Sequence, residues 1–183
     1  GLPGQRARSW EQTLNRALDL GPTHLSAYQL SIEAETVFAS LTENNQLEVV
    51  EEDAIAEMDE ATGELCWAAG LQHYEISNYA RTGYQCRHNL NYWHNDGYLA
   101  CGAGAVSYQE GVRGARIRDP EHYCRMLEQE EDVISEREKL DPGDSFKETV
   151  IMGLRLISGI SERRLQKRYG LSLSDVYGSE MDR

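Results

Sequence analysis

The chain has 183 residues, of which 40% are apolar and 27% charged, as expected for a soluble globular protein of one large domain or one and a half small ones. Its formal net charge of −13 disfavours non-specific binding to nucleic acid or to an anionic membrane surface. We find no apolar run near the roughly 20 residues of a membrane span and no signal peptide, so we expect no integral membrane segment.

The cysteines, the charge distribution and the first residues of the chain add three observations. Cys66, Cys86, Cys101 and Cys124 match no CxxC spacing and are too few for a disulfide scaffold, so we expect reduced thiols in a cytoplasmic protein. Residues 1–136 hold 23 acidic against 9 basic side chains, whereas residues 137–183 hold 8 against 9. The chain starts without Met in a segment of loop composition, which predicts a fragment or a processed product.

The first part of the chain predicts alternating helices and strands. Ser9 to Gln12 form a capping-box pattern ahead of a helix that ends at Gly21 and Pro22. Residues 24–32 predict a short buried strand, residues 55–65 keep helical spacing, and residues 72–76 predict the next strand. This order fits a βαβ series with a parallel sheet.

Residues 33–64 contain 11 acidic side chains and no lysine or arginine. A solvated acidic helix face explains this composition. A metal site is the alternative, but these carboxylates lack a companion histidine at ligand spacing.

The stretch from His73 to Ser107 is dense in aromatic residues and holds three of the five histidines, without a sustained helical or strand period. We therefore predict a loop, and loops carry function more often than the elements that they connect. Glu75 and Asn78 lie at the C-terminal end of the preceding strand, where α/β sheets carry their sites. The turn Gly102-Ala103-Gly104-Ala105 permits a close approach of backbone to a ligand, although a plain turn also explains it.

The histidines and aromatic residues of this stretch leave two interpretations open. His88 and His94 are six residues apart, which is poor metal spacing, and His73 and Glu75 alternate on one strand face, where they can pair. Each histidine is otherwise a structural or surface residue. The aromatic side chains form either the floor of a flat pocket or a small core under a long loop: Tyr79, Tyr84, Tyr92, Trp93 and Tyr98.

The region after this stretch predicts a hairpin over residues 106–118 that turns at Glu110 and Gly111. Asp119 and Pro120 are a helix start, and the helix runs over residues 122–129. A rise in charge and a Pro-Gly turn predict a domain boundary near residues 136–144.

Three short helices are expected beyond that boundary, as in a winged helix or another small helical module. The first spans residues 145–157, with Val150, Leu154 and Ile157 on one face. Ser161 caps the second, over residues 162–169, and the third begins at residue 171. The second helix is basic: Arg163, Arg164, Lys167 and Arg168. A nucleic-acid interface or a solvated helix face explains this run, and in so acidic a chain we expect no nucleic-acid partner.

Four sequence blocks together carry a resemblance to a known family. They are GLPGQ at residues 1–5, HLSAYQLSIE at 24–33, HYEISNYA at 73–80, and HNLNYW at 88–93 running on to GAGA at 102–105. In this order and spacing they resemble the radical SAM family of oxygen-independent coproporphyrinogen III oxidases. The YEISNYA and HNLNYW blocks favour the heme-chaperone branch, the HemW-type proteins, over the true oxidases.

The resemblance covers nearly the whole chain and implies an α/β fold in two domains. Residues 1–136 would be the back half of a partial (β/α) radical SAM barrel with a connecting hairpin and helix. Residues 137–183 would be the start of a small helical, winged-helix-like C-terminal domain.

The family binds S-adenosylmethionine and a [4Fe-4S] cluster. The three cysteines of its cluster motif, CxxxCxxC, are absent from this chain. We therefore expect the chain to be inactive alone in radical chemistry, and the resemblance leaves open whether the longer protein is an enzyme.

The resemblance also implies candidate site residues. Ser31 and Val106 match two positions that approach S-adenosylmethionine, mainly through backbone or packing. The turn before Val106 joins this cofactor-binding set: Gly102, Gly104 and Ala105. His88 is a candidate heme contact, because imidazole is a common heme ligand. A heme or substrate pocket would combine it with Gln29, Glu75, Asn78, Tyr92 and Trp93. No catalytic residue and no metal ligand is predicted.

Three functions remain as hypotheses. The first is a heme chaperone that binds heme and delivers it to an acceptor protein. The second is the enzyme of the same family, which oxidatively decarboxylates coproporphyrinogen III to protoporphyrinogen IX in porphyrin biosynthesis. The third is a non-catalytic helical module at residues 137–183 that binds a partner through its basic helix.

Overall fold

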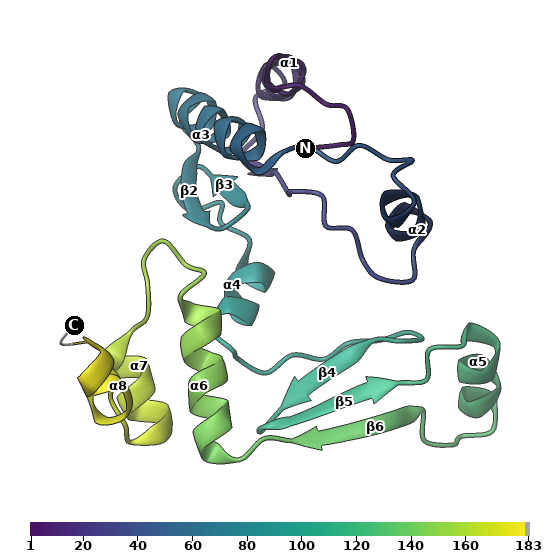
Figure 1. The fold of residues 1–183 in the computed structure, drawn as a ribbon. Coiled ribbons are helices and arrows are strands. Elements are labelled where there is room, and N and C mark those ends of the chain that lie inside the picture. Colours follow the sequence, from purple (N-terminus) through teal and green to yellow (C-terminus); the bar gives the residue numbers. More distant parts are fainter. Residues whose placement is uncertain (182–183) are drawn as a thin grey trace. The chain divides into compact units, whose positions relative to one another are not determined.

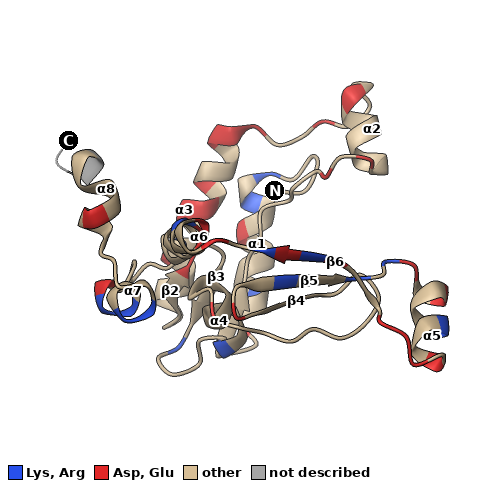
Figure 2. Cartoon of the chain, turned by 90° about the horizontal axis from the view of Figure 1, so that it is seen from below, with Lys and Arg blue, Asp and Glu red and all other residues tan. Residues whose placement is uncertain are grey.

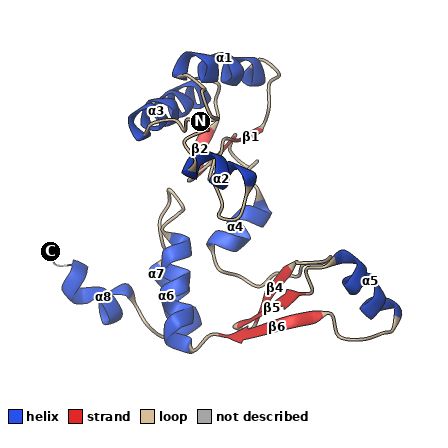
Figure 3. Ribbon diagram, turned by 45° about the vertical axis from the view of Figure 1, so that its right-hand side comes forward, coloured by secondary structure: helices blue, strands red, loops and turns tan. Residues whose placement is uncertain are grey.

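The computed structural model describes residues 1–181, which form two compact units. Unit 1 is Gly1–Cys86, and unit 2 begins at Arg87. Each unit combines helices with one small sheet, as the ribbon and the secondary-structure colours show (Figures 1 and 3). The predicted mixed α/β class is confirmed. Within the described residues, no helix is both long enough and apolar enough to span a membrane.

Unit 1 contains a three-stranded sheet in the order β1-β3-β2. Its elements are α1 (Ala7–Leu18), β1 (His24–Ser26), α2 (Val37–Glu43), α3 (Glu52–Ala68), β2 (Gln72–Glu75) and β3 (Asn78–Ala80). The prediction of a parallel sheet is wrong in its pairing, because β3 lies between β1 and β2 and is antiparallel to both. The two strands that follow α1 and α3 nevertheless run in the same direction.

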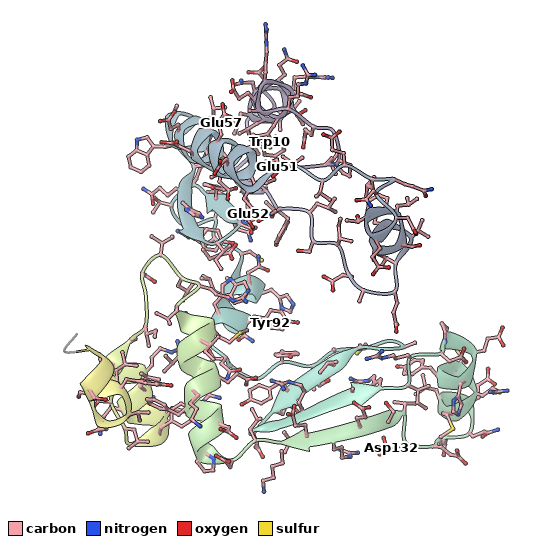
Figure 4. The ribbon with its side chains drawn as sticks, viewed as in Figure 1. Trp10, Glu51, Glu52, Glu57, Tyr92 and Asp132 are labelled. Carbon is pink, nitrogen blue, oxygen red and sulfur yellow. The ribbon has the colours of Figure 1, made fainter. Side chains whose placement is uncertain are left out.

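The core of unit 1 lies between α1, α3 and the sheet. Leu14, Cys66, Leu71 and Tyr79 are its buried members. Trp10 packs against this cluster from α1, and its indole N–H donates to Thr62 Oγ1 of α3 at 2.7 Å (Figure 4). Burial of these apolar groups is what holds the two helices on the sheet.

Three details of unit 1 differ from the sequence-based expectations. The first helix starts at Ala7 with Arg6 as its N-cap, not at Ser9. The strand after it has three residues, so residues 27–32 are irregular. The helix α2 is unexpected; the Thr36 hydroxyl caps it by accepting a hydrogen bond from the Ala39 N–H at 3.2 Å.

Unit 2 contains an antiparallel sheet in the order β4-β5-β6 and five helices among its described residues. Its elements are α4 (Arg87–Trp93), β4 (Val106–Gln109), β5 (Val112–Arg116), α5 (Pro120–Glu128), β6 (Ile134–Lys139), α6 (Pro142–Gly153), α7 (Glu162–Tyr169) and α8 (Leu173–Met181). The predicted hairpin is confirmed, and Glu110 and Gly111 turn it with φ values of 51° and 77°. Asp119 caps α5 as expected.

The stretch from His73 to Ser107 is not the loop that its composition predicts. It contains most of β2, all of β3 and α4, and the first residues of β4. These elements are so short that neither hydrophobic period is sustained, which is why periodicity does not detect them.

The helical part of unit 2 packs around Phe146, Val150 and Leu165. The predicted face of α6 is wrong beyond Val150, because the helix ends at Gly153 and leaves Leu154 and Ile157 68% and 63% exposed. The prediction for α7 is confirmed, with Ser161 as its N-cap and Gly170 as its left-handed C-cap.

The expected domain boundary after Glu136 falls inside β6, which pairs with β5 on both sides of that position. The division of the chain into domains 1–136 and 137–183 stays a prediction.

Candidate functional site

A buried polar network closes one end of the unit 1 sheet. Asn78, which begins β3, and Glu75, which ends β2, are each 1% exposed. The Asn78 side-chain amide donates to the Glu75 carboxylate and, at 3.3 Å, to Tyr28 Oη. The Asn78 side-chain oxygen accepts from Ser26 Oγ at 2.5 Å. A buried carboxylate needs donors, and Asn78 supplies one to Glu75.

His73 does not take part in this network. The register of β2 against β3 shifts between His73 and Glu75, and such a bulge redirects the side chains that follow it. His73 is exposed, stacks on Tyr79 with ring centroids 4.5 Å apart, and contacts the Ile76 carbonyl oxygen at 3.1 Å. The predicted pairing of His73 with Glu75 is therefore wrong.

Gln29 and Ser31 lie in the irregular segment after β1, and both are exposed. Gln29 lines a cavity of about 20 Å³ together with Trp10 and Tyr28. A cavity of that size holds about one water molecule. The S-adenosylmethionine contact at Ser31 stays a prediction.

The helix α4 carries the HNLNYW block. His88 and Tyr92 are one helical turn apart, and their rings meet edge to face with centroids 4.8 Å apart. The ring of Tyr92, labelled in Figure 4, also packs against that of Tyr98, with centroids 4.5 Å apart. The His88 imidazole is exposed beside this pair of rings.

Trp93 faces a different environment. The Arg155 guanidinium lies over its ring, 5.2 Å from the centroid, and its buried indole N–H has no partner within the described residues. His88 is thus the exposed member of this aromatic block, and Tyr92 and Trp93 are half-buried.

The Gly-Ala-Gly turn has the left-handed backbone that requires glycine, with φ of 108° at Gly102 and 71° at Gly104. The Gly102 N–H donates to Tyr123 Oη at 3.3 Å, and the Gly104 N–H donates to the Ile117 carbonyl at 2.8 Å. The Ala105 N–H donates to the Gly102 carbonyl at 3.3 Å. These amides already have partners, so the turn has a structural role. A cofactor contact at this turn or at the half-buried Val106 stays a prediction. Such a contact would be made through side-chain packing or backbone carbonyl groups.

The predicted cofactor-binding residues and the predicted pocket residues both divide between the two units. One group belongs to unit 1: Gln29, Ser31, Glu75 and Asn78. The other belongs to unit 2: His88, Tyr92, Trp93, Gly102, Gly104, Ala105 and Val106. Glu75 and Asn78 contact each other, as do His88 and Tyr92. The predicted heme or substrate pocket, which takes Gln29, Glu75 and Asn78 from the first group and His88, Tyr92 and Trp93 from the second, stays a prediction.

Sequence patterns do not point to Asn95 and Asp96, which connect α4 to α6 and α7. The buried Asn95 amide donates to Glu148 at 3.2 Å and to Thr149 at 3.0 Å, and its backbone carbonyl accepts from Arg168 at 2.6 Å. One terminal nitrogen of Arg164 donates to both carboxylate oxygens of Asp96, at 2.8 and 2.7 Å.

The spacing of Arg164 and Arg168 is the signal that could have found this network. Residues four apart share a helix face and can reach the same loop. Arg164 and Arg168 are exposed, as a solvated basic helix predicts. What the prediction omits is that they also bind Asp96 and Asn95.

Burial shifts several pKa values. It raises the pKa of the Cys66 thiol to about 11 and that of Tyr79 to about 12. Burial, followed by the nearby Arg164 guanidinium, lowers the pKa of His94 below its usual value. This shift favours the neutral form of the His94 imidazole.

The cysteines present here do not fit an iron–sulfur cluster, which is held by several thiolates at one point. Cys66 is 0% exposed in the unit 1 core. Among residues 1–181, no three His, Cys, Asp or Glu side chains gather closely enough to hold a metal ion. The carboxylates at residues 33–64 are included in this statement, so the structure gives no support to the alternative of a metal site there.

The chain is similar in sequence to several characterised proteins, although no family model matches it. It is 34% identical over 179 residues to heme chaperone HemW of Bacillus subtilis, and the aligned region covers 98% of this chain and 47% of that protein. It is 40% identical over 140 residues to heme chaperone HemW of Escherichia coli, and this aligned region covers 73% of this chain and 36% of that protein. A mouse protein, radical S-adenosyl methionine domain-containing protein 1, mitochondrial, is 31% identical over 191 residues, with 100% and 43% covered.

One solved structure shares the fold. Coproporphyrinogen III oxidase (HemN) from Escherichia coli, a radical SAM enzyme, aligns with a TM-score of 0.76 at 17% identity, over 100% of this chain and 44% of that chain. This confirms the predicted partial radical SAM fold. The chain spans less than half the length of these relatives, so it corresponds to one portion of each of them.

Proposed function

We propose that this chain, a homologue of the heme chaperone HemW proteins, belongs to a radical SAM-family heme chaperone that binds heme and delivers it to an acceptor protein. The observation that carries this proposal is the sequence identity to proteins of that name, 34% over nearly the whole chain in Bacillus subtilis. S-adenosylmethionine and a [4Fe-4S] cluster would belong to the longer protein, because the thiols of this chain do not gather into a ligand set. A cytoplasmic location is part of the same proposal.

The heme contact that we propose within this chain is His88. Its imidazole is exposed, and the Tyr92 ring supports it from one helical turn away. Neutral imidazole nitrogen is a common axial ligand of heme iron, and aromatic side chains suit the flat, apolar face of the macrocycle. The proposed roles of Gln29, Glu75, Asn78 and the glycine turn in ligand binding rest on the family resemblance alone.

The structural likeness to HemN supports the fold and adds nothing in favour of oxidase activity, since one fold hosts several functions. The two functions differ in what happens to the ligand. A chaperone retains heme and passes it on unchanged, whereas the oxidase converts coproporphyrinogen III.

The test is to incubate the protein with hemin, separate it by gel filtration and measure the heme that co-elutes. The loaded protein is then mixed with apomyoglobin, whose absorbance reports transfer. We expect heme to co-elute and to move to the acceptor, and coproporphyrinogen III to remain unchanged under anaerobic, reducing conditions. Failure to retain heme would contradict the proposal, and conversion of coproporphyrinogen III by the full-length protein would then favour the oxidase.

A further inference from the structure

A cavity of about 480 Å³ lies in unit 2, against the basic helix α7. Six residues line it: His94 and Asp96 from the segment after α4, Thr149 from α6, and Arg164, Lys167 and Arg168 from α7. Its volume is within the range of small-molecule sites, about 300–1,000 Å³. Figure 2 shows the blue basic residues gathered on α7.

The lining of this cavity carries an excess of positive charge in an acidic protein. Three cationic side chains face one carboxylate, that of Asp96, which Arg164 already binds through both oxygens. Lys167 forms no ion pair within the described residues. An anionic ligand would therefore be attracted to the cavity, and a cationic one repelled.

Two of the cationic groups are held in place before any ligand arrives. Arg164 is fixed by Asp96, and Arg168 by the Asn95 carbonyl oxygen at 2.6 Å. Each guanidinium has five N–H donors, so these bonds leave further donors for a ligand. Preorganised donors of this kind suit carboxylates, which accept two hydrogen bonds from one arginine.

His94 adds a polar group without adding charge. Burial and the neighbouring Arg164 lower its pKa, which favours the neutral ring, a donor at one nitrogen and an acceptor at the other. Together with the Thr149 hydroxyl it provides polar contacts beside the charged wall.

We propose that the α7 cavity binds the carboxylates of an anionic ligand, through Lys167 and the free donors of Arg164 and Arg168. Resting on the proposed function, we infer that these carboxylates are the two propionates of a porphyrin. This assignment gives the basic helix a role in ligand binding in place of the solvated face that its composition predicts.

The experiment compares the full chain with two variants of α7 in equilibrium titrations with hemin and with hemin dimethyl ester, followed in the Soret band. Lys167→Glu reverses one charge in the cavity wall. Arg163→Glu makes the same change in charge on the same helix, at an exposed residue outside the cavity. Circular dichroism checks that all three proteins fold.

We expect Lys167→Glu to raise the Kd for hemin about tenfold, a loss of about 1.4 kcal/mol, and Arg163→Glu to change it less than twofold. A further variant, Lys167→Arg, keeps the charge, and once its fold is checked in the same way it should bind hemin as tightly as the wild-type chain. The dimethyl ester, which lacks the carboxylates, should bind the wild-type chain more weakly than hemin and should not distinguish the variants.

Equal effects of the two glutamate variants would overturn the assignment, as would equal binding of hemin and its ester. In that case hemin still binds, and the proposed function stands. Absence of any saturable hemin binding by the wild-type chain would overturn both proposals.

Discussion

Asn78 joins three side chains at the closed end of the unit 1 sheet: those of Ser26, Tyr28 and Glu75. The position of Asn78 and Glu75 at a strand end can be predicted from the sequence. Their mutual hydrogen bond cannot, because it depends on the bulge in β2 and on the antiparallel pairing with β3. The same holds for Asn95, whose partners lie more than 50 residues away on α6 and α7.

Replacing Asn78 with aspartate should destabilise the protein by about 3 kcal/mol or more at pH 7, because it places two carboxylates together in a buried site. Urea unfolding measures the change. Ser26→Ala is the control; Ser26 is exposed, so losing its hydrogen bond should cost about 1 kcal/mol or less. Equal effects of the two substitutions would show that burial at Asn78 does not matter.

The buried thiol of Cys66 and the exposed thiols of Cys101 and Cys124 should differ in reactivity. Cys66 is buried with a pKa raised to about 11, whereas Cys101 and Cys124 are exposed. Only the thiolate reacts, so iodoacetamide at pH 8 should label the two exposed cysteines in the native protein and label Cys66 only after denaturation. Mass spectrometry of the digested protein locates the label, and rapid native labelling of Cys66 would contradict this core.

The predictability of an element depended on whether its own residues determine it. The helix α7 was predicted to the residue because Ser161 and Gly170 are local start and stop signals. The antiparallel pairing through β3 was not, since it is a tertiary contact of a three-residue strand. The predicted core face of α6 is correct at Val150 and wrong beyond it, because periodicity does not detect the end of the helix at Gly153.

The corrected face of α6 is tested by two alanine substitutions. Val150→Ala should lower the free energy of unfolding by about 1–3 kcal/mol, because Val150 is buried against Phe146 and Leu165. Leu154→Ala should change it by about 0.5 kcal/mol or less, because that side chain is 68% exposed. Urea titration of both variants measures the difference, and a larger loss at Leu154 would restore the sequence-based face.

The two units differ in charge. Unit 1 holds 14 acidic against 4 basic residues, and the rest of the chain 17 against 14. In Figure 2, the red acidic residues on the ribbon of α3 and the blue basic residues on that of α7 show this contrast. The overall acidic field offers no general attraction for an anionic porphyrin, so the proposed heme binding would depend on local groups such as His88 and the α7 cavity.

The chain as a whole should not cleave S-adenosylmethionine. Its cysteines have neither the CxxxCxxC spacing nor a common location among the described residues. After anaerobic reconstitution with iron and sulfide and reduction with dithionite, we expect no 5′-deoxyadenosine above background by liquid chromatography. The full-length HemW protein of Bacillus subtilis, treated identically, is the comparison, and formation of 5′-deoxyadenosine by this chain would contradict the prediction.

Heme binding by this chain is most directly measured by titrating it with hemin and following the Soret band. We predict a saturable shift with a micromolar midpoint, weakened about tenfold or more by His88→Ala and unchanged by His122→Ala, which removes another exposed histidine. A linear increase in absorbance that matches hemin in buffer alone would contradict the account.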